Sequence, residues 1–383
     1  MYKPNYKNKS IVNLMSSIAR ARGGCTEYPE LKLLGSKSIR DSKNIVLIVI
    51  DGLGYDYLMR NNGFMKDNLK GYVDSVFLPT TACAITSFMT GVCVNQHALS
   101  GWFVFLKEYG VLMIPLPFVP RYGGIPVSEF GIEMKDIFNE KTIFQKIKTK
   151  SYIVQPKKII DTDYTNYFGR GAKKVGYESL NGFFKKIEEK IKNEKGKKFI
   201  FSYWPMFDKV GHQKGIGSKD SEKHFLEIES KLKSFIKKIK GTNTTVILTA
   251  DHGMIDAPLK DVIKLENHPR LKECLVMPLS GEIRAAYCYV KPTKVSQFEN
   301  YIKTKLKKYC YFVKSPELVK KGYYGLYKNN PKLYDRIGDY VLIMKGNYII
   351  KDKIGKDKYN KFIGHHGGVS KEEMQVPLVV FRC

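Results

Sequence analysis

"IVLIVIDGLGYDYL", residues 45–58, joins an unbroken run of six apolar residues to Asp51 and Gly52. Most of the six are β-branched, and a short run of this kind, bounded by a glycine, predicts a buried strand. A carboxylate at the end of a buried strand loses hydration, which costs on the order of several kcal/mol unless a positive group pairs with it. The first question about the fold is therefore which positive group lies opposite the Asp51 carboxylate.

The rest of the chain alternates between strand-like and helix-like segments. Strands are predicted at residues 45–50, 199–203, 245–250 and 376–381, and helices at residues 82–90, 141–148, 179–193 and 219–239. Short apolar strands that alternate with helices predict an α/β fold with a mostly parallel central sheet flanked by helices. Ligands of such sheets bind beyond the carboxyl ends of the strands, which is where Asp51 would lie.

Three regions are expected along the chain. Residues 1–43 form an N-terminal extension packed on the core, and residues 44–255 together with 337–383 form the core. Residues 256–336 interrupt the core and form a small inserted α/β cap subdomain. An insert beside a site often selects the substrate or closes over it.

Composition sets the broad class of the protein. The 383 residues are 43% hydrophobic, which is enough for a large core. No apolar run approaches the ~20 residues of a membrane span, and the polar start "MYKPNYKNKS" lacks the apolar region of a signal peptide, so a cytoplasmic location is expected. Seven cysteines without a CxxC pair argue against a disulfide framework.

The net charge of +28 has two interpretations. One is a polyanionic partner such as nucleic acid or a membrane surface. The other, which we favour, is compositional bias, since the lysines lie on the polar faces of amphipathic helices among abundant Asn, Ile and Tyr. Either way, a basic field attracts a substrate that carries phosphate.

Carboxylates and imidazoles recur where the predicted strands end. Four of the seven histidines take part, and the full set is Asp51, Asp208, His212, Asp251, His252, His365 and His366. The spacing of Asp208 and His212 puts both on one face of a helical turn. Gathered in one crevice, these groups need a countercharge. Mixed Asp and His ligation suits Zn²⁺ or another transition metal better than Ca²⁺ or Mg²⁺.

The stretch "LPTTACAITSFMTG", residues 78–91, places two threonines before a helix of small residues that ends at Gly91. The N-terminus of such a helix favours a phosphoryl group. A threonine at the N-cap is more often only a cap. Beside a metal cluster, however, its hydroxyl becomes a candidate nucleophile.

Six stretches together resemble the alkaline phosphatase superfamily and, within it, the type I phosphodiesterase/nucleotide pyrophosphatase family. They are "IVLIVIDGLGYDYL", "PTTACAITSFMTG", "YFGRGAKKVGYESL", "YWPMFDKVGH", "LTADHGM" and "GHHGGVSKEEMQVPLVV", and they span residues 45–380 in the family's order. The resemblance implies an alkaline-phosphatase-like core. It also implies an enzyme with two divalent metal ions, usually Zn²⁺, with Mn²⁺ or Mg²⁺ as alternatives.

Carried over motif by motif, the resemblance assigns roles to particular residues. The first ion would be held by Asp51, Asp251, His252 and the nucleophile, and the second by Asp208, His212 and His366, with His365 as the alternative. Counting back ten residues from Gly91 makes Thr81, rather than Thr80, the nucleophile, placed at the N-cap. The implied reaction is hydrolysis of a phosphodiester or phosphoanhydride through a phosphothreonine intermediate, and the implied partner is a small phosphate-containing substrate such as a nucleotide.

The substrate is where the sequence departs from the family. Related nucleotide pyrophosphatases carry an asparagine that binds phosphate, whereas this chain reads "QHALSGWF", with Trp102 near that place. Trp102, Arg121 and Tyr122 are candidates for a substrate pocket, with loop packing as an equal alternative. A phosphomonoesterase, a phosphomutase and a phosphonate hydrolase of the same superfamily stay open. A basic nucleic-acid-binding protein on a degenerate hydrolase fold is the less favoured hypothesis from another class.

Overall fold

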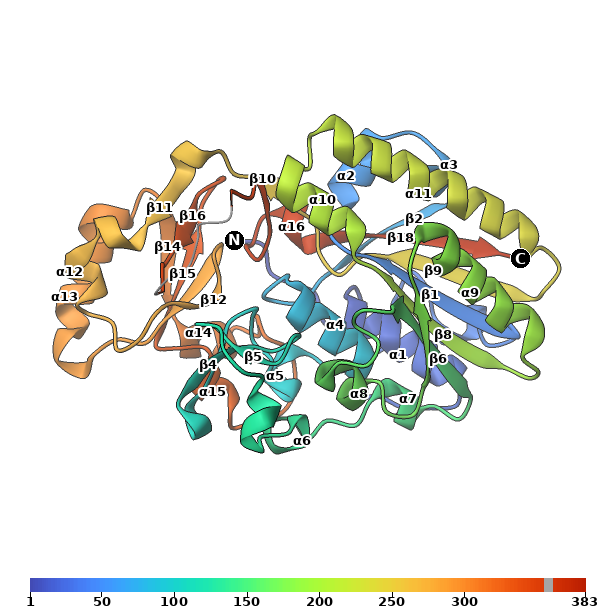
Figure 1. Ribbon diagram of the computed structural model, residues 1–383, viewed down its shortest axis with the longest axis horizontal. Helices are drawn as coiled ribbons and strands as arrows, with labels where there is room; N and C mark the ends of the chain where they lie inside the picture. The colour runs from blue at the N-terminus through green and yellow to red at the C-terminus, as the bar shows by residue number, and fades with distance from the viewer. Residues whose placement is uncertain (355–360) are drawn as a thin grey trace.

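A seven-stranded sheet forms the centre of the computed structural model, which describes residues 1–354 and 361–383 (Figure 1). In spatial order its strands are β2 (Leu69–Asp74), β18 (Gln375–Arg382), β9 (Thr244–Thr249), β1 (Asn44–Ile50), β8 (Lys198–Trp204), β6 (Lys150–Pro156) and β7 (Lys173–Tyr177). Strand β18 is antiparallel to both of its neighbours, and the other pairs are parallel. The predicted mostly parallel α/β sheet is confirmed.

Strand β1 sits between β9 and β8, and all seven of its residues are buried. Its register pairs Ile50 with Trp204 on β8 and Val49 with Thr249 on β9. A strand covered on both faces needs a continuous apolar run, which the sequence supplies. Because the three strands are parallel and in step, the residues that follow them meet at one edge of the sheet.

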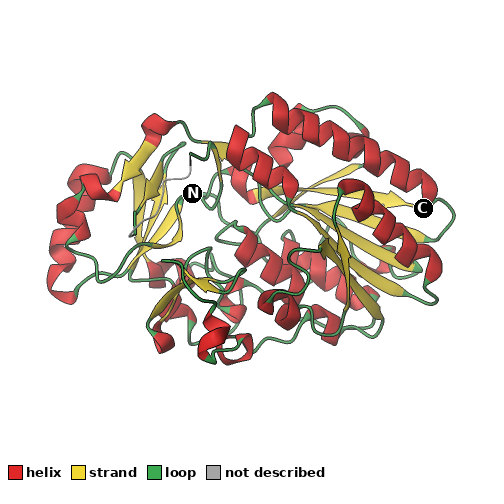
Figure 2. Ribbon diagram, in the orientation of Figure 1, coloured by secondary structure: helices red, strands yellow, loops and turns green. Residues whose placement is uncertain are grey.

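Helices cover both faces of this sheet (Figure 2). The long amphipathic α11 (Lys219–Lys238) packs beside α9 (Leu180–Asn193) and α10 (Met206–Lys214) on one face. The other face carries α1 (Ile11–Ala21), α4 (Thr81–Thr90), α7 (Ile143–Lys146) and α8 (Asp163–Phe168). Shorter helices are α2 (Tyr55–Arg60), α3 (Phe64–Asp67), α5 (Val94–His97), α6 (Met134–Ile137) and α16 (Lys371–Met374).

The N-terminal residues contribute to the main core. The apolar residues Ile11, Leu14 and Ile18 of α1 are fully buried and belong to the same hydrophobic cluster as strand β1. Helix α1 packs against α4 and α7. No helix in the described ranges, 1–354 and 361–383, combines the length and the apolar character needed to cross a membrane.

Helix α4 is buried along its whole length. Most of its side chains are small, and this allows the helix to pack inside the molecule rather than on the surface. It begins one residue earlier than predicted, because Thr80 has an extended backbone and Thr81 is already helical. The placement of Thr81 at the N-cap is therefore wrong: Thr80 is the N-cap and Thr81 the first helical residue. Gly91 ends the helix with a φ of 71°, a left-handed conformation that glycine adopts without strain.

The inserted region builds a second sheet with its own hydrophobic core. The four strands, in spatial order, are β12 (Ser280–Glu282), β13 (Ala285–Cys288), β15 (Tyr340–Met344) and β14 (Cys310–Lys314). Helices α12 (Pro269–Lys272) and α13 (Val295–Tyr301) pack on it. Smaller parts of the insert are β11 (Val262–Lys264) paired with β16 (Ile349–Lys351), and helices α14 (Ser315–Lys320) and α15 (Leu333–Arg336). The sheet of β3 (Val104–Leu106), β4 (Val111–Ile114) and β5 (Val119–Pro120) comes from an earlier part of the chain and adjoins the insert through the bridge from Phe103 to Gly281.

The sequence analysis expects the chain to return from the insert to the core at residue 337, and the structure differs here. Strand β15 pairs with β13 and β14, and β16 pairs with β11, so residues 340–351 belong to the insert. The apolar run "YVLIM" reads as a core strand because a buried strand has the same pattern in either sheet. The next segment of the central sheet is β18.

A buried ion pair joins the insert to the core. The guanidinium of Arg284, between β12 and β13, donates to both carboxylate oxygens of Glu373 on α16, at 3.0 Å and 2.8 Å. It also donates to the carbonyl oxygens of Gly346 and Tyr348. Burial opposes ionisation, but Arg284 still keeps the pKa of Glu373 below its ordinary value. The pair is almost fully excluded from water.

Replacing Arg284 should destabilise the protein more than replacing any exposed basic residue. The Arg284→Met substitution leaves a buried carboxylate unpaired, so we expect a loss of about 3–5 kcal/mol in the free energy of unfolding. The matched control is Lys321→Met, because Lys321 forms an exposed pair with Glu317, and there the change should stay within about 0.5 kcal/mol. Urea unfolding measures both, and equal effects would contradict the assignment.

Candidate metal centre

Acidic and imidazole side chains from four segments meet at the carboxyl edge of the central sheet. Asp51 follows β1, Asp251 and His252 follow β9, and Asp208 and His212 lie one turn apart on α10. His366 follows β17 (Gly364–His365), which pairs with β10 (Ile255–Asp256) just beyond β9. The short β10–β17 ladder therefore brings the "GHHGG" loop to the strand ends.

Asp51, Asp251 and His252 form one group of potential ligands. One ligand atom from each lies within 4.8 Å of the others. The Nε2 atom of His252 is 3.4 Å from Asp51 Oδ1 and 3.5 Å from Asp251 Oδ2. All three residues are buried.

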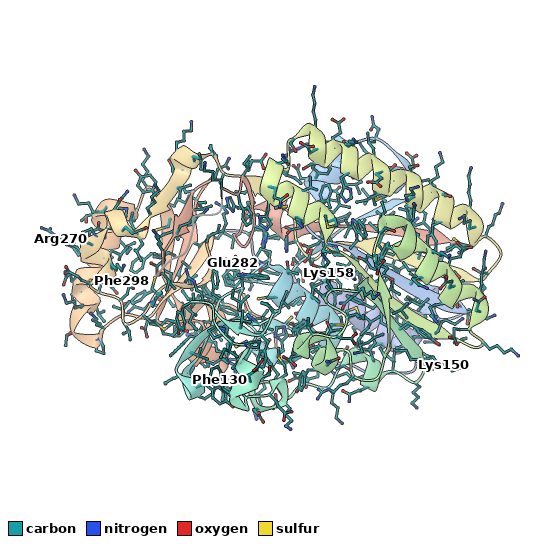
Figure 3. All side chains as sticks on the ribbon, in the orientation of Figure 1. Phe130, Lys150, Lys158, Arg270, Glu282 and Phe298 are labelled. Atoms are coloured by element: carbon teal, nitrogen blue, oxygen red, sulfur yellow. The ribbon has the colours of Figure 1, made fainter. Side chains whose placement is uncertain are left out.

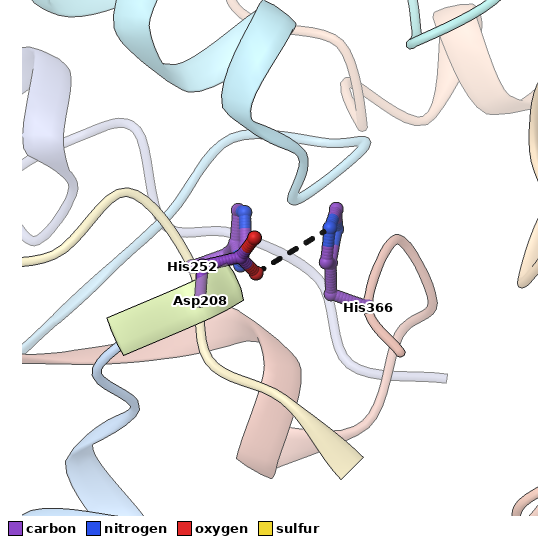
Figure 4. A group of neighbouring side chains, drawn as sticks. All are labelled: Asp208, His252 and His366. Carbon is purple, nitrogen blue, oxygen red and sulfur yellow. Dashed lines mark ion pairs between the residues drawn. The ribbon is translucent and has the colours of Figure 1, made fainter. Parts of the chain in front are cut away.

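Asp208, His252 and His366 form a second group with the same spacing limit (Figure 4). The Nε2 atom of His366 is 3.9 Å from Asp208 Oδ1, and the rings of His252 and His366 stack with centroids 3.7 Å apart. His212 adjoins this group, since its Nε2 is 3.3 Å from Asp208 Oδ2. His252 thus belongs to both groups of potential ligands.

The carboxylates of this centre lack compensating protein charge. Burial, together with the negative charge of Asp251, holds the pKa of both Asp51 and Asp208 well above the ordinary value. Asp51 Oδ1, Asp208 Oδ1 and Asp251 Oδ2 are buried and have no hydrogen-bond partner within the described part of the chain. Buried oxygens of this kind are normally paired, so the cluster fits a cation.

The three imidazoles present the right nitrogen to such a cation. The Nδ1 atoms of His212, His252 and His366 face the backbone oxygens of Gly364, Gly253 and Pro79, at 2.7, 3.2 and 3.2 Å. A carbonyl oxygen only accepts, so each Nδ1 carries the proton and each Nε2 keeps its lone pair. Burial lowers the pKa of all three, that of His212 to about 4, so the rings are neutral at pH 7. The donor set fits a divalent transition metal.

The structure distinguishes His366 from its neighbour His365. The Nε2 atom of His365 faces the backbone oxygen of Phe362 at 3.1 Å, and its ring is not part of either ligand group. His366 is the residue that reaches Asp208.

The two candidate threonines occupy different environments. Thr81 Oγ1 lies 3.2 Å from His252 Nε2, at the first position of α4. The Thr80 side chain is fully buried, and its hydroxyl donates to Glu282 Oε1 at 2.5 Å. Of the two, only Thr81 contacts a member of the ligand groups.

Two polar residues of this region have no counterpart in the sequence prediction. Tyr203, on β8, donates its hydroxyl to Asp51 Oδ2. Glu282, on β12 of the insert, is buried, and its pKa is raised to about 8 by burial, although hydrogen bonds from Thr80 and from backbone N–H groups oppose the shift. The position of Tyr203 directly before "WPMFD" is a weak sequence signal for a place at the site, and the sequence around Glu282 carries no such signal.

The residues predicted for a substrate pocket have other contacts. Arg121 donates to the backbone oxygens of Leu279 and Asp352 and lies over the ring of Phe103. Tyr122 is 54% exposed, and Trp102 packs partly buried against the main core. The structure thus uses Arg121 to tie the β3–β5 sheet to the insert and does not bring it to the metal centre.

Comparisons with known proteins agree with this geometry. The family described as type I phosphodiesterase / nucleotide pyrophosphatase matches residues 45–369. No curated protein sequence matches the chain.

Solved structures share the fold at low sequence identity. Murine ectonucleotide pyrophosphatase/phosphodiesterase 5 is 20% identical, with 87% of each chain covered and a TM-score of 0.65. An inactive threonine-to-alanine variant of it, in complex with AMP, has a TM-score of 0.66 at 19% identity, again with 87% of each chain covered. Phosphonoacetate hydrolase from Sinorhizobium meliloti 1021 with phosphonoformate is 16% identical, covers 88% of this chain and 89% of its own, and has a TM-score of 0.63.

Neutralising one carboxylate should have opposite effects with and without metal. Asp208→Asn removes like-charge repulsion, so the metal-free protein should melt at a higher temperature than the metal-free wild type at pH 8. In the wild type, added Zn²⁺ should raise the melting temperature by about 5–10 °C, and the variant should lose the part of this gain that comes from the ion assigned to Asp208.

The matched control is Asp256→Asn. Asp256 accepts hydrogen bonds from the backbone N–H groups of Ile216 and Gly217, so this variant should be less stable both with and without metal, while the gain on adding Zn²⁺ remains. A wild-type melting temperature indifferent to chelator and Zn²⁺ would contradict the metal centre.

Proposed function

The chain belongs to the type I phosphodiesterase / nucleotide pyrophosphatase family and is a phosphoester hydrolase, and on this premise we propose that it cleaves phosphodiester or phosphoanhydride bonds through a phosphothreonine at Thr81. The observation that carries the proposal is the Thr81 hydroxyl, 3.2 Å from His252 within a buried cluster of carboxylates and imidazoles. The neighbouring structure described as inactive has a threonine replaced by alanine, which supports a threonine nucleophile.

Two divalent ions are proposed, Zn²⁺ first, with Mn²⁺ or Mg²⁺ as alternatives. Asp51, Asp251, His252 and Thr81 would hold the first, and Asp208, His212 and His366 the second. When bound, such ions neutralise the buried carboxylates and stabilise negative charge on the phosphoryl oxygens.

The chain's own residues supply the nucleophile and the anion site. The N–H groups of the first turn of α4 and the positive end of its dipole favour the oxygens of a phosphoryl group. The Thr81 hydroxyl gives its proton to solvent and its oxygen attacks phosphorus. The bond from threonine to phosphorus forms, the bond to the leaving oxygen breaks, and solvent protonates the leaving group as needed. Water then attacks the phosphothreonine, releases phosphate or a phosphate monoester, and restores the hydroxyl.

A small nucleotide or nucleotide-like phosphate compound is the proposed substrate. The family description and the AMP bound to a neighbouring structure support this choice. A phosphonate hydrolase is the second candidate, because a phosphonoacetate hydrolase has a TM-score of 0.63, close to that of the pyrophosphatase neighbours. A phosphomonoesterase and a phosphomutase on the same fold are separated from these by the substrate assay below.

The high positive charge does not favour nucleic acid as a partner. Lysines on the exposed face of α9 pair with carboxylates nearby, as in Lys186–Glu189, Lys192–Glu188 and Lys190–Glu194. This pattern supports a solvated helix face rather than a continuous track for phosphates.

Three variants of the two threonines test the reaction. With bis-p-nitrophenyl phosphate as the diester, Thr81→Ala should lower turnover by several orders of magnitude and Thr81→Ser should retain measurable activity, because the oxygen survives. Thr80→Ala should cost far less than Thr81→Ala. Acid quenching should trap phosphate on Thr81 in the wild type.

The control substrates are p-nitrophenyl phosphate and a phosphonate. A diesterase should turn over the diester faster than either, and metal depletion should abolish the activity until Zn²⁺ is restored. Near-full activity of Thr81→Ala, or trapped phosphate on another residue, would refute the covalent route.

The charge interpretation predicts weak binding to DNA. At physiological salt, a random duplex should bind no more tightly than the non-specific range of ~10⁻⁴–10⁻⁶ M, and the affinity should fall steeply with added salt. Fluorescence anisotropy measures both quantities. A much tighter affinity with little salt dependence would favour the nucleic-acid hypothesis instead.

A further inference from the structure

Glu282 reaches from the insert to the turn that carries the candidate nucleophile. Strand β12 ends at this residue, and Figure 3 shows it where the insert meets the core. Its Oε1 atom accepts a hydrogen bond from the Thr80 hydroxyl at 2.5 Å, and its carboxylate also interacts with the backbone N–H groups of Trp102 and Ile283. These donors hold the Glu282 side chain in place beside Thr80, the residue directly before Thr81.

The contact changes what Thr80 does as an N-cap. A threonine at this position ordinarily accepts a hydrogen bond from an N–H group in the first turn of its helix. The Thr80 side chain makes no such bond: its Oγ1 is turned toward Glu282, to which the hydroxyl donates, and in this orientation the lone pairs of the oxygen do not meet the first-turn N–H groups. The N–H groups that a capping hydroxyl would occupy are the ones that favour a phosphoryl oxygen.

The backbone on both sides of Glu282 is held firmly. Gly281 and Phe103 exchange two backbone hydrogen bonds, at 2.7 Å and 3.1 Å. Gly101 packs so closely on Gly281 that a Cβ atom at position 101 would lie 2.7 Å from the Gly281 Cα. Two residues after Glu282, Arg284 forms the buried pair with Glu373, whose Oε1 also accepts the N–H of Gly368 beside the His366 loop.

We propose that Glu282 is a positioning residue for the hydrolytic reaction, which draws the Thr80 hydroxyl away from the helix so that Thr81 and the N-terminus of α4 stay open to the phosphoryl group. This inference rests on the proposed function at Thr81. It makes the insert a structural part of the catalytic centre rather than only a cover over it.

The electrostatic cost of this carboxyl supports a functional role. The Glu282 side chain is buried, and burial raises its pKa to about 8. An apolar residue of similar size would avoid this cost. A carboxyl retained beside a cluster of like charge is a feature of functional sites rather than of stable cores.

A double-variant experiment tests the proposal. Glu282→Met removes the acceptor, so the Thr80 hydroxyl turns to cap α4, and kcat/KM for bis-p-nitrophenyl phosphate should fall on the order of 10²-fold. Thr80→Val removes the hydroxyl that would cap, and its loss should be smaller. Combined with Glu282→Met, it should restore activity to the Thr80→Val level, whereas independent roles would multiply the two losses.

Additional readouts separate positioning from general damage. Inhibition by inorganic phosphate should weaken in Glu282→Met and recover in the double variant, while the content of bound metal stays at the wild-type value. Glu282→Gln keeps an oxygen for Thr80 and should stay within several-fold of wild type. The matched control is Glu299→Gln, since Glu299 also accepts a hydroxyl, that of Tyr340, but lies in α13 of the insert, and its kinetics should not change.

The outcomes distinguish this inference from the function on which it rests. An active wild type, an inactive Thr81→Ala and a Glu282→Met variant with wild-type kcat/KM would overturn the role of Glu282 alone. Losses that multiply in the double variant would overturn it as well. An inactive wild type towards diester, monoester and phosphonate would instead overturn the proposed function.

Discussion

Three carboxylates buried at one edge of a parallel sheet repel one another strongly, and the site exists because the fold holds them there. Asp51 and Asp251 follow adjacent strands that run in step, and Asp208 follows the strand on the other side. The sheet can impose this repulsion because its interior is large and apolar, and because the free energy of its packing exceeds the local cost. A cation bound between the carboxylates would neutralise their repulsion, so the same arrangement would then stabilise the folded protein.

Helix α4 places the positive end of its dipole at the same edge of the sheet. A helix buried along its whole length presents its N-terminal N–H groups only where the chain leaves an opening, and here that opening lies at Thr81. The proposed nucleophile, the helix dipole and the candidate metal ligands thus converge, because α4 begins where three strands of the central sheet end.

Two of the buried polar contacts that couple the insert to the core lie next to the candidate site. Arg284 pairs with Glu373, and Glu282 accepts from Thr80 two residues earlier on the same segment. Both contacts reach the segments that carry the candidate site, namely the loop of His366 and the turn of Thr81.

The amino-acid sequence by itself determined the family and four strands of the central sheet, β1, β8, β9 and β18, because these depend on recognisable motifs and on local apolar runs, whereas β2, β6 and β7 were not predicted. It predicted Asp51, Asp208, His212, Asp251 and His252 as ligands and, through the family resemblance, His366 before His365. The start of α4 was wrong by one residue, because the end of a helix depends on backbone conformation. Tertiary structure alone decided that residues 340–351 join the insert, since a buried strand has one pattern in any sheet. It alone also brought Glu282 to Thr80 across 202 positions of sequence, because a contact between distant segments follows from how two sheets pack and leaves no periodic signal in either segment.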